Sequence, residues 1–244
     1  MPPGLRRAAS KLLDPDRIAS AQERWRLHRE RQEQRREAHA PENRVQSWAN
    51  MAACLGKRYE DCSFENYHVQ FEAQAEAVRA IKDYASRMAE HVASGRGIVL
   101  FGKWGTGKDH LLTALIRCAI VEHGFNVQWK DGSVLQADFR DVLRSRDRSE
   151  DVMRRRFLSP SILALSDPLP QTGELKNFQQ TKLYELIDGR YRARRPTWIT
   201  INVQNREEAS RKLGAAIHER LRDRSMLVYF GWESHRKPLG GSTR

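Results

Sequence analysis

The sequence Gly102-Lys103-Trp104-Gly105-Thr106-Gly107-Lys108-Asp109 decides the fold of this protein, because it matches the pattern G-x-x-x-x-G-K. An apolar run at 97–101 precedes it, and residues 110–122 repeat apolar side chains at helical spacing. A strand, a glycine-rich loop and a helix in this order direct backbone N–H groups and a helix N-terminus at phosphate oxygens. A plain glycine turn before a core helix is the alternative. We predict that the chain binds a nucleoside triphosphate, or descends from a protein that did.

Within this loop, Lys108 is expected to reach the β- and γ-phosphates as a point charge. The other residues predicted to contact nucleotide here are Gly102, Lys103, Trp104, Gly105, Thr106, Gly107, Asp109 and His110. Asp109 stands where Ser or Thr usually supplies a hydroxyl to Mg²⁺. A carboxylate can hold Mg²⁺, but it also brings a negative charge close to the phosphates. Nucleotide affinity should therefore depend more steeply on Mg²⁺ than in an ordinary phosphate-loop protein.

The composition limits the possible classes of protein. A chain of 244 residues can hold one α/β domain and a smaller appendage. With 43 Lys and Arg against 31 Asp and Glu, the formal charge is +12, which favours an anionic partner such as nucleic acid, or serves solubility. The three cysteines form no C-x-x-C pair, so neither a disulfide framework nor a zinc site is expected. No apolar run approaches the roughly 20 residues that span a membrane, so a cytoplasmic protein with no membrane partner is expected.

Two parts of the chain differ in composition. Residues 1–57 are predicted to be a basic, mostly helical extension, either solvated or used to dock a partner. Within it, Pro41 is expected to end a first charged helix, and Trp48, Met51 and Leu55 suggest a second, short helix with one apolar edge. Residues 58–244 are predicted to be the nucleotide-binding domain.

A helix is expected over 69–94, just before the first strand, with an aromatic cluster of Tyr59, Phe64 and Tyr67 ahead of it. Its apolar stripe consists of Phe71, Ala75, Val78, Ile81, Ala85, Met88 and Val92. Such a stripe is more often core than binding surface.

After the loop, strands and helices alternate, which predicts an α/β fold with a five-stranded parallel sheet covered on both faces. The further strands are expected at 126–130, 161–167, 197–203 and 226–230, and the helices at 132–158, 182–191 and 217–224. The third strand ends in Asp167, the position of an acid that holds Mg²⁺ in phosphate-loop proteins. The fourth strand carries a polar residue, Asn202, near its exit.

Arginines are concentrated in the helical region 132–158. They are Arg140, Arg144, Arg146, Arg148, Arg154, Arg155 and Arg156. Acidic neighbours offset part of this charge, so a solvated face and a nucleic-acid groove are both compatible with the pattern.

These motifs resemble the bacterial replicative helicase loaders (DnaC-like) and the ATP-binding partners of insertion-sequence transposases (IstB-like). The segments that carry the resemblance are Phe64-Glu65-Asn66-Tyr67, Gly105 to Leu111, Leu183 to Asp188, Arg194 to Thr197, Arg220-Leu221 and Trp232 to Arg236. They cover roughly residues 58–237, and their order along the chain is more specific than any single motif.

The resemblance implies an AAA+ fold with a reduced C-terminal lid. It makes Asp167 the Mg²⁺ carboxylate, Asn202 the polar sensor near the γ-phosphate, and Arg236 a second sensor. Arg220 resembles the arginine finger that completes a neighbouring subunit's site, which implies an ATP-dependent homo-oligomer. The arginine-rich region 132–158 corresponds to the segment where initiator-type relatives bind single-stranded DNA.

One departure from the family concerns Pro168. The family has a second acid after the magnesium carboxylate, and here Pro168 follows Asp167. Because that acid orients the attacking water, ATP hydrolysis should be slow or dependent on assembly. The leading hypothesis is an ATP-dependent switch that binds single-stranded DNA and a replicative helicase. The alternatives are an accessory ATPase that delivers target DNA to a transposase, and an ATP-bound DNA-binding adaptor that does not hydrolyse.

Overall fold

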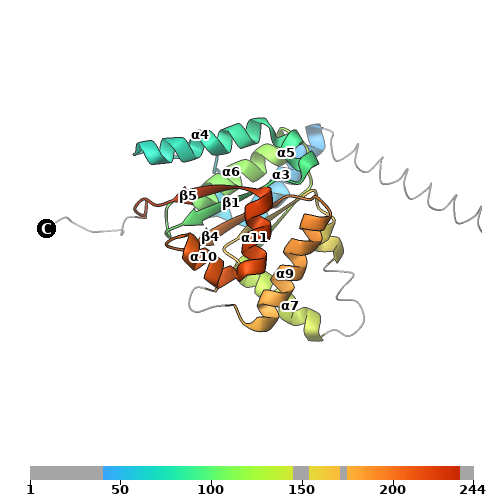
Figure 1. Ribbon diagram of the computed structural model, residues 1–244. Coiled ribbons are helices and arrows are strands. Elements are labelled where there is room, and N and C mark those ends of the chain that lie inside the picture. Colours follow the sequence, from blue (N-terminus) through green and yellow to red (C-terminus); the bar gives the residue numbers. More distant parts are fainter. Residues whose placement is uncertain (1–40, 145–153, 171–174, 237–244) are drawn as a thin grey trace, which may run out of the picture.

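Five parallel strands form one sheet with the order β2-β3-β4-β1-β5, so the strand that precedes the glycine loop lies inside the sheet (Figure 1). The computed structural model describes residues 41–144, 154–170 and 175–236. The strands are β1 (Gly97–Gly102), β2 (Val127–Asp131), β3 (Ile162–Ser166), β4 (Thr197–Asn202) and β5 (Ser225–Phe230). The α/β class, the five parallel strands and their approximate positions are as predicted.

Successive residues of each strand point to opposite faces of the sheet, and each face has its own apolar core. Ile98 and Leu100 of β1 pack with the helices α4 (Glu72–Ser86), α5 (Met88–Ser94) and α6 (Lys108–Val121). Val99 and Phe101 pack into the opposite core, which is covered by α7 (Gly132–Arg144), α9 (Asn177–Arg192), α10 (Arg206–Leu213) and α11 (Ala215–Arg224). The sheet is therefore the middle layer of three (Figure 1).

The helix expected over 69–94 is interrupted. Arg87 has φ −107° and ψ 25°, outside the helical region, and separates α4 from α5. Phe71 lies before α4 and is 52% exposed, so it does not belong to the buried stripe. The prediction of one continuous helix with Phe71 in its apolar face is wrong at these two points.

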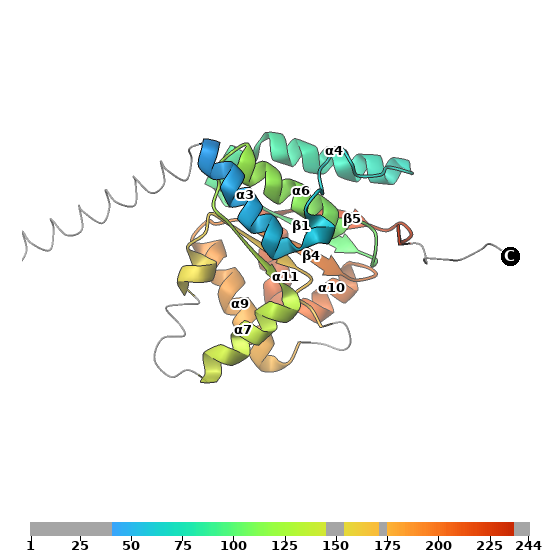
Figure 2. The ribbon, with the colours of Figure 1, turned by 180° about the vertical axis from the view of Figure 1, so that it is seen from behind.

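The helix α3 (Pro41–Leu55) lies against α6, as seen from behind (Figure 2). Ala52 and Leu55 are buried, and the guanidinium of Arg117 on α6 lies 5.7 Å from the ring centre of Trp48. The apolar edge of this helix is thus packed against the domain, whereas the charged helix that the sequence predicted to end at Pro41 lies outside the described residues. A short 3₁₀ turn, η1 (Lys57–Tyr59), leads from α3 toward the aromatic cluster.

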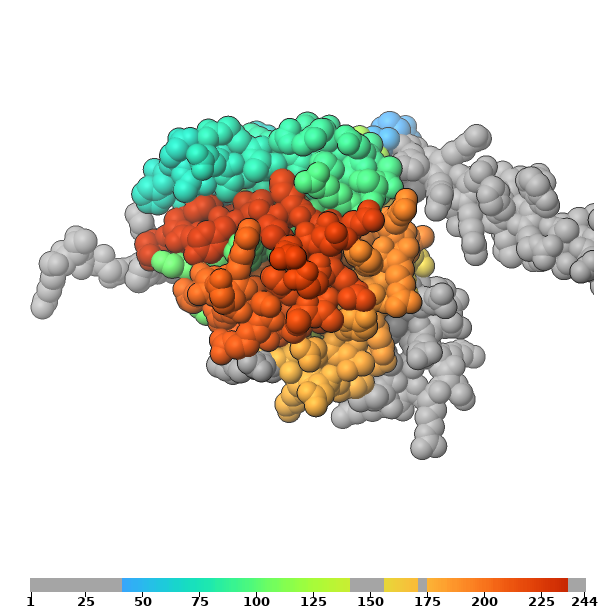
Figure 3. Space-filling model, in the orientation of Figure 1, coloured from blue at the N-terminus to red at the C-terminus, as the bar shows by residue number. Residues whose placement is uncertain are grey.

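The region 132–158 contains α7 and a short π-helix, η2 (Arg154–Leu158). The helix α10 was not predicted, because its sequence is mostly charged. Together, α9, α10 and α11 form a continuous surface below β5 (Figure 3). No helix in the described part of the chain is both long and apolar enough to cross a bilayer.

Candidate nucleotide-binding site

The glycine loop connects β1 to α6 in a conformation that needs its glycines. Gly105 and Gly107 have φ of +72° and +90°, a region that side chains rarely adopt. A Cβ at Gly105 would lie 2.0 Å from the Ser234 hydroxyl oxygen, and one at Gly107 would lie 2.5 Å from the Tyr67 ring. The loop is therefore closely packed between the C-terminal tail and the segment before α4.

Lys108 is the first residue of α6, and its side chain is buried inside the loop. Its Nζ donates hydrogen bonds to the carbonyl oxygens of Gly102, at 3.0 Å, and Lys103, at 2.5 Å. Burial lowers the pKa of Lys108 to about 8. The ammonium group thus lies at the centre of the loop, where the lysine of this motif contacts phosphate oxygens.

Asp109 faces the ends of two strands. Its Oδ1 accepts a hydrogen bond from the Ser166 hydroxyl at the end of β3 and another from the Thr200 hydroxyl on β4, each over 2.8 Å. The strand order makes this possible, because β4 lies between β1 and β3 and brings their carboxyl ends together. Ser166 and Thr200 were not among the predicted site residues, although both lie near strand exits.

Asp167 lies one residue beyond β3 and has a φ of +47°, which Asp tolerates better than most residues. Its carboxylate accepts hydrogen bonds from Asn202, over 2.6 Å from Nδ2 and 3.3 Å from the main-chain N–H. Burial raises the pKa of Asp167, and the hydrogen bonds from Asn202 oppose that rise. Two predicted site residues from neighbouring strands are thus in direct contact.

The C-terminal tail closes over the loop. The indole N–H of Trp232 donates to the Thr106 carbonyl at 3.0 Å, and the His235 N–H donates to the Gly105 carbonyl at 2.9 Å. Lys103 and Glu233 form an ion pair at 2.8 Å. The tail motif quoted from the sequence therefore belongs to the site.

A cleft of about 320 Å³ lies beside the loop. Arg236 and Asn202 line it together with the loop residues from Trp104 to His110. The segment before α4 provides the remaining wall, which consists of Arg58, Tyr59, Cys62, Asn66, Tyr67 and His68. In this wall, Tyr59 and Tyr67 belong to the aromatic cluster predicted from the sequence, and Asn66 belongs to the quoted segment Phe64 to Tyr67. Its volume lies at the lower end of the range of small-molecule sites, about 300–1,000 Å³.

Arg220 lies outside this cleft. On α11, its Nε donates to Oδ1 of Asp188 over 2.5 Å, and its Nη2 donates to the hydroxyl of Tyr184 over 2.7 Å. The guanidinium also lies 4.6 Å from the centre of the Tyr184 ring. Arg220 is thus held against α9 and does not line the cleft of its own chain.

The predicted DNA-binding arginines are only partly described. Arg140 and Arg156 are exposed, and Arg156 lies 3.8 Å from Asp138. Arg144, Arg154 and Arg155 belong to α7 and η2, but their side chains are not described. Arg146 and Arg148 lie outside the described residues.

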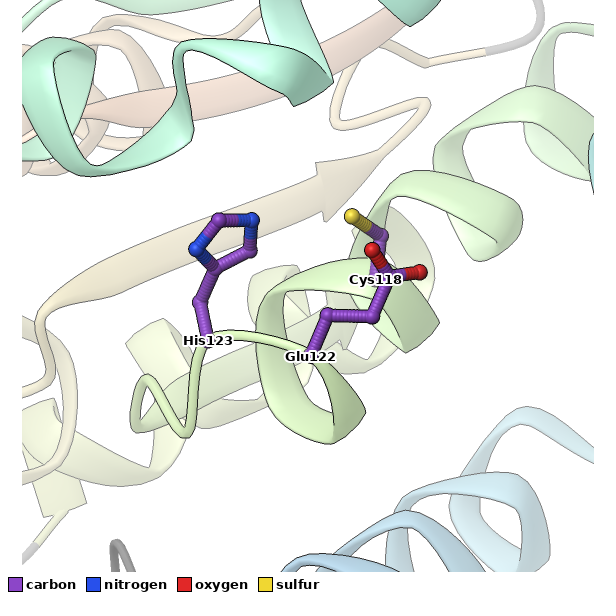
Figure 4. Close-up of side chains that lie close together, drawn as sticks. All are labelled: Cys118, Glu122 and His123. Atoms are coloured by element: carbon purple, nitrogen blue, oxygen red, sulfur yellow. The ribbon is translucent and has the colours of Figure 1, made fainter.

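A separate group of Cys118, Glu122 and His123 lies at the far end of α6, where the three side chains approach one another (Figure 4). Burial, followed by the negative charge of Glu122, raises the pKa of Cys118 to about 12. A thiol binds metal as its thiolate, so this environment disfavours it as a ligand, and we assign no ion to this group.

The chain is similar to known proteins over about three quarters of its length. The chain is 28% identical over 184 residues to the replicative helicase loader DnaC of Escherichia coli (strain K12), covering 75% of this chain and 72% of DnaC. The crystal structure of the DnaC helicase loader superimposes with a TM-score of 0.62 at 21% identity, covering 72% of this chain and 99% of that one. The replication initiator DnaA bound to AMPPCP and single-stranded DNA gives a TM-score of 0.58 at 19% identity, covering 72% of this chain and 50% of that one.

These structural similarities establish an AAA+ fold like those of DnaC and DnaA. The model of the family described as IstB-like ATP binding protein matches residues 8–239, nearly the whole chain and a longer stretch than the motifs alone suggested. The chain belongs to the family of IstB-like ATP binding proteins.

Proposed function

We propose that this protein is an ATP-dependent switch of the helicase-loader type, which binds ATP with Mg²⁺, single-stranded DNA and a replicative helicase. The observation that carries the proposal is the contact between the phosphate loop and the C-terminal tail, together with the similarity to DnaC. Because tail residues donate hydrogen bonds to Thr106 and Gly105, we expect a change at the phosphates to alter the position of the C-terminal tail.

The residues around the loop fit ATP and Mg²⁺. Lys108 supplies a buried cation for the phosphates, and the aromatic wall with Tyr59 and Tyr67 offers a surface for the base. Asp109 and Ser166 provide hard oxygen donors of the kind that Mg²⁺ prefers, and Asp167 follows Ser166 in the chain. An ion held by these residues would supply positive charge close to the phosphate oxygens.

The orientation of Arg220 supports assembly into a homo-oligomer. Asp188 and Tyr184 hold its guanidinium on the surface formed by α9 and α11, outside the cleft of the same chain. An arginine that is presented in this way can complete the site of a neighbouring copy. We propose that ATP favours this contact and that turnover depends on it.

Single-stranded DNA is the proposed ligand of the arginines between 140 and 156. The test is the salt dependence of the affinity for a fluorescent oligonucleotide, because each phosphate contact contributes about −0.7 to the slope of log K against log salt. Replacing Arg140 and Arg156 by Gln should reduce both the affinity and the slope. An affinity that does not depend on salt would instead favour base stacking on aromatic side chains.

The helicase partner can be tested by size-exclusion chromatography of the full chain with the replicative helicase of the same organism, in ATP and Mg²⁺. We expect co-elution, and we expect its loss when residues 1–40 are deleted. The deletion stops at residue 40 because α3 packs against α6. Unchanged nucleotide binding by the shortened chain is the control for folding.

The family model gives a specific reason for a second candidate, an accessory ATPase that delivers target DNA to a transposase. Separate elution from the helicase, with co-elution of a transposase encoded nearby, would favour that function. ATP turnover equal to that of Lys108→Ala, in the presence of single-stranded DNA, would favour an adaptor that does not hydrolyse.

A further inference from the structure

The magnesium ligands of phosphate-loop proteins come from two places. The loop supplies a Ser or Thr hydroxyl, and the strand that corresponds to β3 supplies a carboxylate. In this chain the loop supplies the carboxylate of Asp109, and the last residue of β3 supplies the hydroxyl of Ser166. We propose that the carboxylate and the hydroxyl that hold Mg²⁺ have exchanged places, and that Asp167 is thereby free to orient water. This inference rests on the proposed function.

The contact between the two residues supports the exchange. Ser166 Oγ lies 2.8 Å from Oδ1 of Asp109. An ionised carboxylate only accepts hydrogen bonds, so the hydroxyl donates and keeps its lone pairs free for a cation. The hydroxyl and the carboxylate are thus in direct contact, with the hydroxyl on the strand and the carboxylate on the loop.

The second oxygen of Asp109 is available as well. Thr200 also donates to Oδ1, over 2.8 Å, so both hydroxyl groups bind the same carboxylate oxygen. Within the described residues, Oδ2 accepts no hydrogen bond. Thr200 and Ser166 are paired in the β3–β4 register, so the carboxylate is held by two rigid, buried strands. This arrangement leaves one carboxylate oxygen and one hydroxyl oxygen for the ion.

The carboxylate of Asp167 contacts Asn202 instead. Its φ of +47° follows the end of β3, and both of its carboxylate oxygens accept hydrogen bonds from Asn202. Counted from the strand end, Ser166 and Asp167 then correspond to the magnesium ligand and the water-orienting acid, and Pro168 lies beyond the pair. This assignment replaces the sequence-based hypothesis that Asp167 holds the ion and that Pro168 removes the acid.

A double-mutant cycle tests the exchange through binding rather than turnover. The affinity for a fluorescent ATP analogue is measured in Mg²⁺ and in EDTA, and the ratio of the two affinities is the Mg²⁺ enhancement. It is determined for the full chain and for Asp109→Ser, Ser166→Asp and the double variant. Asp109→Ser removes the carboxylate, and Ser166→Asp places a second carboxylate beside the first. Each variant should therefore reduce the Mg²⁺ enhancement by about tenfold, an effect of the size that contacts between neighbouring residues produce.

The double variant restores one hydroxyl and one carboxylate in the opposite order. We expect its Mg²⁺ enhancement to return to within about threefold of the original, because neighbouring residues in one network are not additive. The exchange would be overturned if the double variant lost Mg²⁺ enhancement by a factor equal to the product of the two single-variant factors. Thermal unfolding of all four proteins identifies any variant that fails to fold.

Asp167→Asn gives an independent test. If Asp167 orients water, this variant keeps the Mg²⁺ enhancement. It also keeps the electron paramagnetic resonance signal of Mn²⁺ bound together with nucleotide, and only its turnover falls. Loss of the Mg²⁺ enhancement, with binding in EDTA intact, would overturn the exchange but not the proposed function. Failure of the unaltered protein to bind the ATP analogue under either condition would overturn the proposed function itself.

Discussion

The indole N–H of Trp232 donates a hydrogen bond over 3.0 Å to the main-chain carbonyl of Thr106, in the middle of the phosphate loop. The hydroxyl of Tyr67 donates to the same oxygen over 3.0 Å. A residue near the C-terminus and a residue before α4 therefore meet at one atom of the loop. This shared acceptor makes the loop conformation sensitive to both segments.

Replacing Trp232 by Phe should weaken nucleotide binding modestly, because it removes one of two donors and keeps an aromatic ring. A neutral hydrogen bond contributes about 1 kcal/mol, so we expect about a fivefold loss of affinity for the single variant and a larger loss when Tyr67→Phe is added. Titration with a fluorescent ATP analogue measures both. Trp129→Phe, on β2, is the matched control, and an equal effect there would contradict the argument.

Arg220 should act on a neighbouring copy of the chain. Lys108→Ala and Arg220→Ala should each lose turnover, the second by about a thousandfold if Arg220 is an arginine finger. When the two variants are mixed, some interfaces join an intact Lys108 to an intact Arg220, so turnover should recover above the sum of the two. A mixture that gives only the sum would contradict an action between copies.

Arg190 is fully buried and should be essential for stability. Its guanidinium donates to the carbonyl oxygens of Phe157, Pro160, Ser161 and Pro196, which tie the segments before β3 and β4 to α9. Burial lowers its pKa to about 9, so it remains charged at neutral pH. Arg190→Met leaves these carbonyls without their donor, and each such loss costs about 1–3 kcal/mol.

We therefore expect Arg190→Met to lower the free energy of unfolding by more than about 3 kcal/mol in urea titrations. Arg192→Met is the control, because Arg192 is 74% exposed and pairs with Asp188 at the surface, where such pairs contribute about 1 kcal/mol or less. Similar losses in the two variants would contradict the role of the buried guanidinium.

His91 should make stability depend on pH. Its ring stacks on Tyr84 with centres 4.3 Å apart, and its pKa is lowered by burial and then by Arg96 and Arg87, while Glu90 and Asp83 oppose the shift. Because the folded pKa lies below the unfolded value of about 6.5, the unfolded chain takes up the proton first as pH falls. His91 therefore costs stability as pH falls below about 6.5, until the folded form is also protonated.

The variant His91→Phe keeps a ring against Tyr84 and cannot titrate. Its free energy of unfolding should decline less than that of the unaltered protein between pH 7 and acidic pH. Comparing the two proteins by chemical denaturation at each pH removes the contribution of other groups, including His235, whose pKa burial also lowers. Parallel pH profiles would contradict the prediction.

The sequence predicts the strands well because most of them are short apolar runs bounded by turn residues, as in 97–101 and 197–203. The phosphate loop is equally clear, because its glycine spacing and the flanking elements agree. By contrast, the break at Arg87 leaves no sequence signal, since no Gly or Pro marks it. The exposed Phe71 fits the helical period but lies outside the helix.

The site was predictable only in part, for a topological reason. Local motifs identify Lys108 and Asp167, but the contact between Asp109 and Ser166 joins residues 57 positions apart. That contact depends on the placement of β4 between β1 and β3, which strand prediction does not reveal. Likewise, only the structure brings Asp188 against Arg220 and thereby orients that arginine.

The packing of α3 has a mechanical consequence. The Arg44 side chain donates to the carbonyl of Glu122 over 3.0 Å, at the end of α6 opposite Lys108. With 14 residues, α6 is about 20 Å long and stiff along its axis. A force on α3 can therefore be transmitted along the axis of α6 to Lys108, the residue that faces the phosphates.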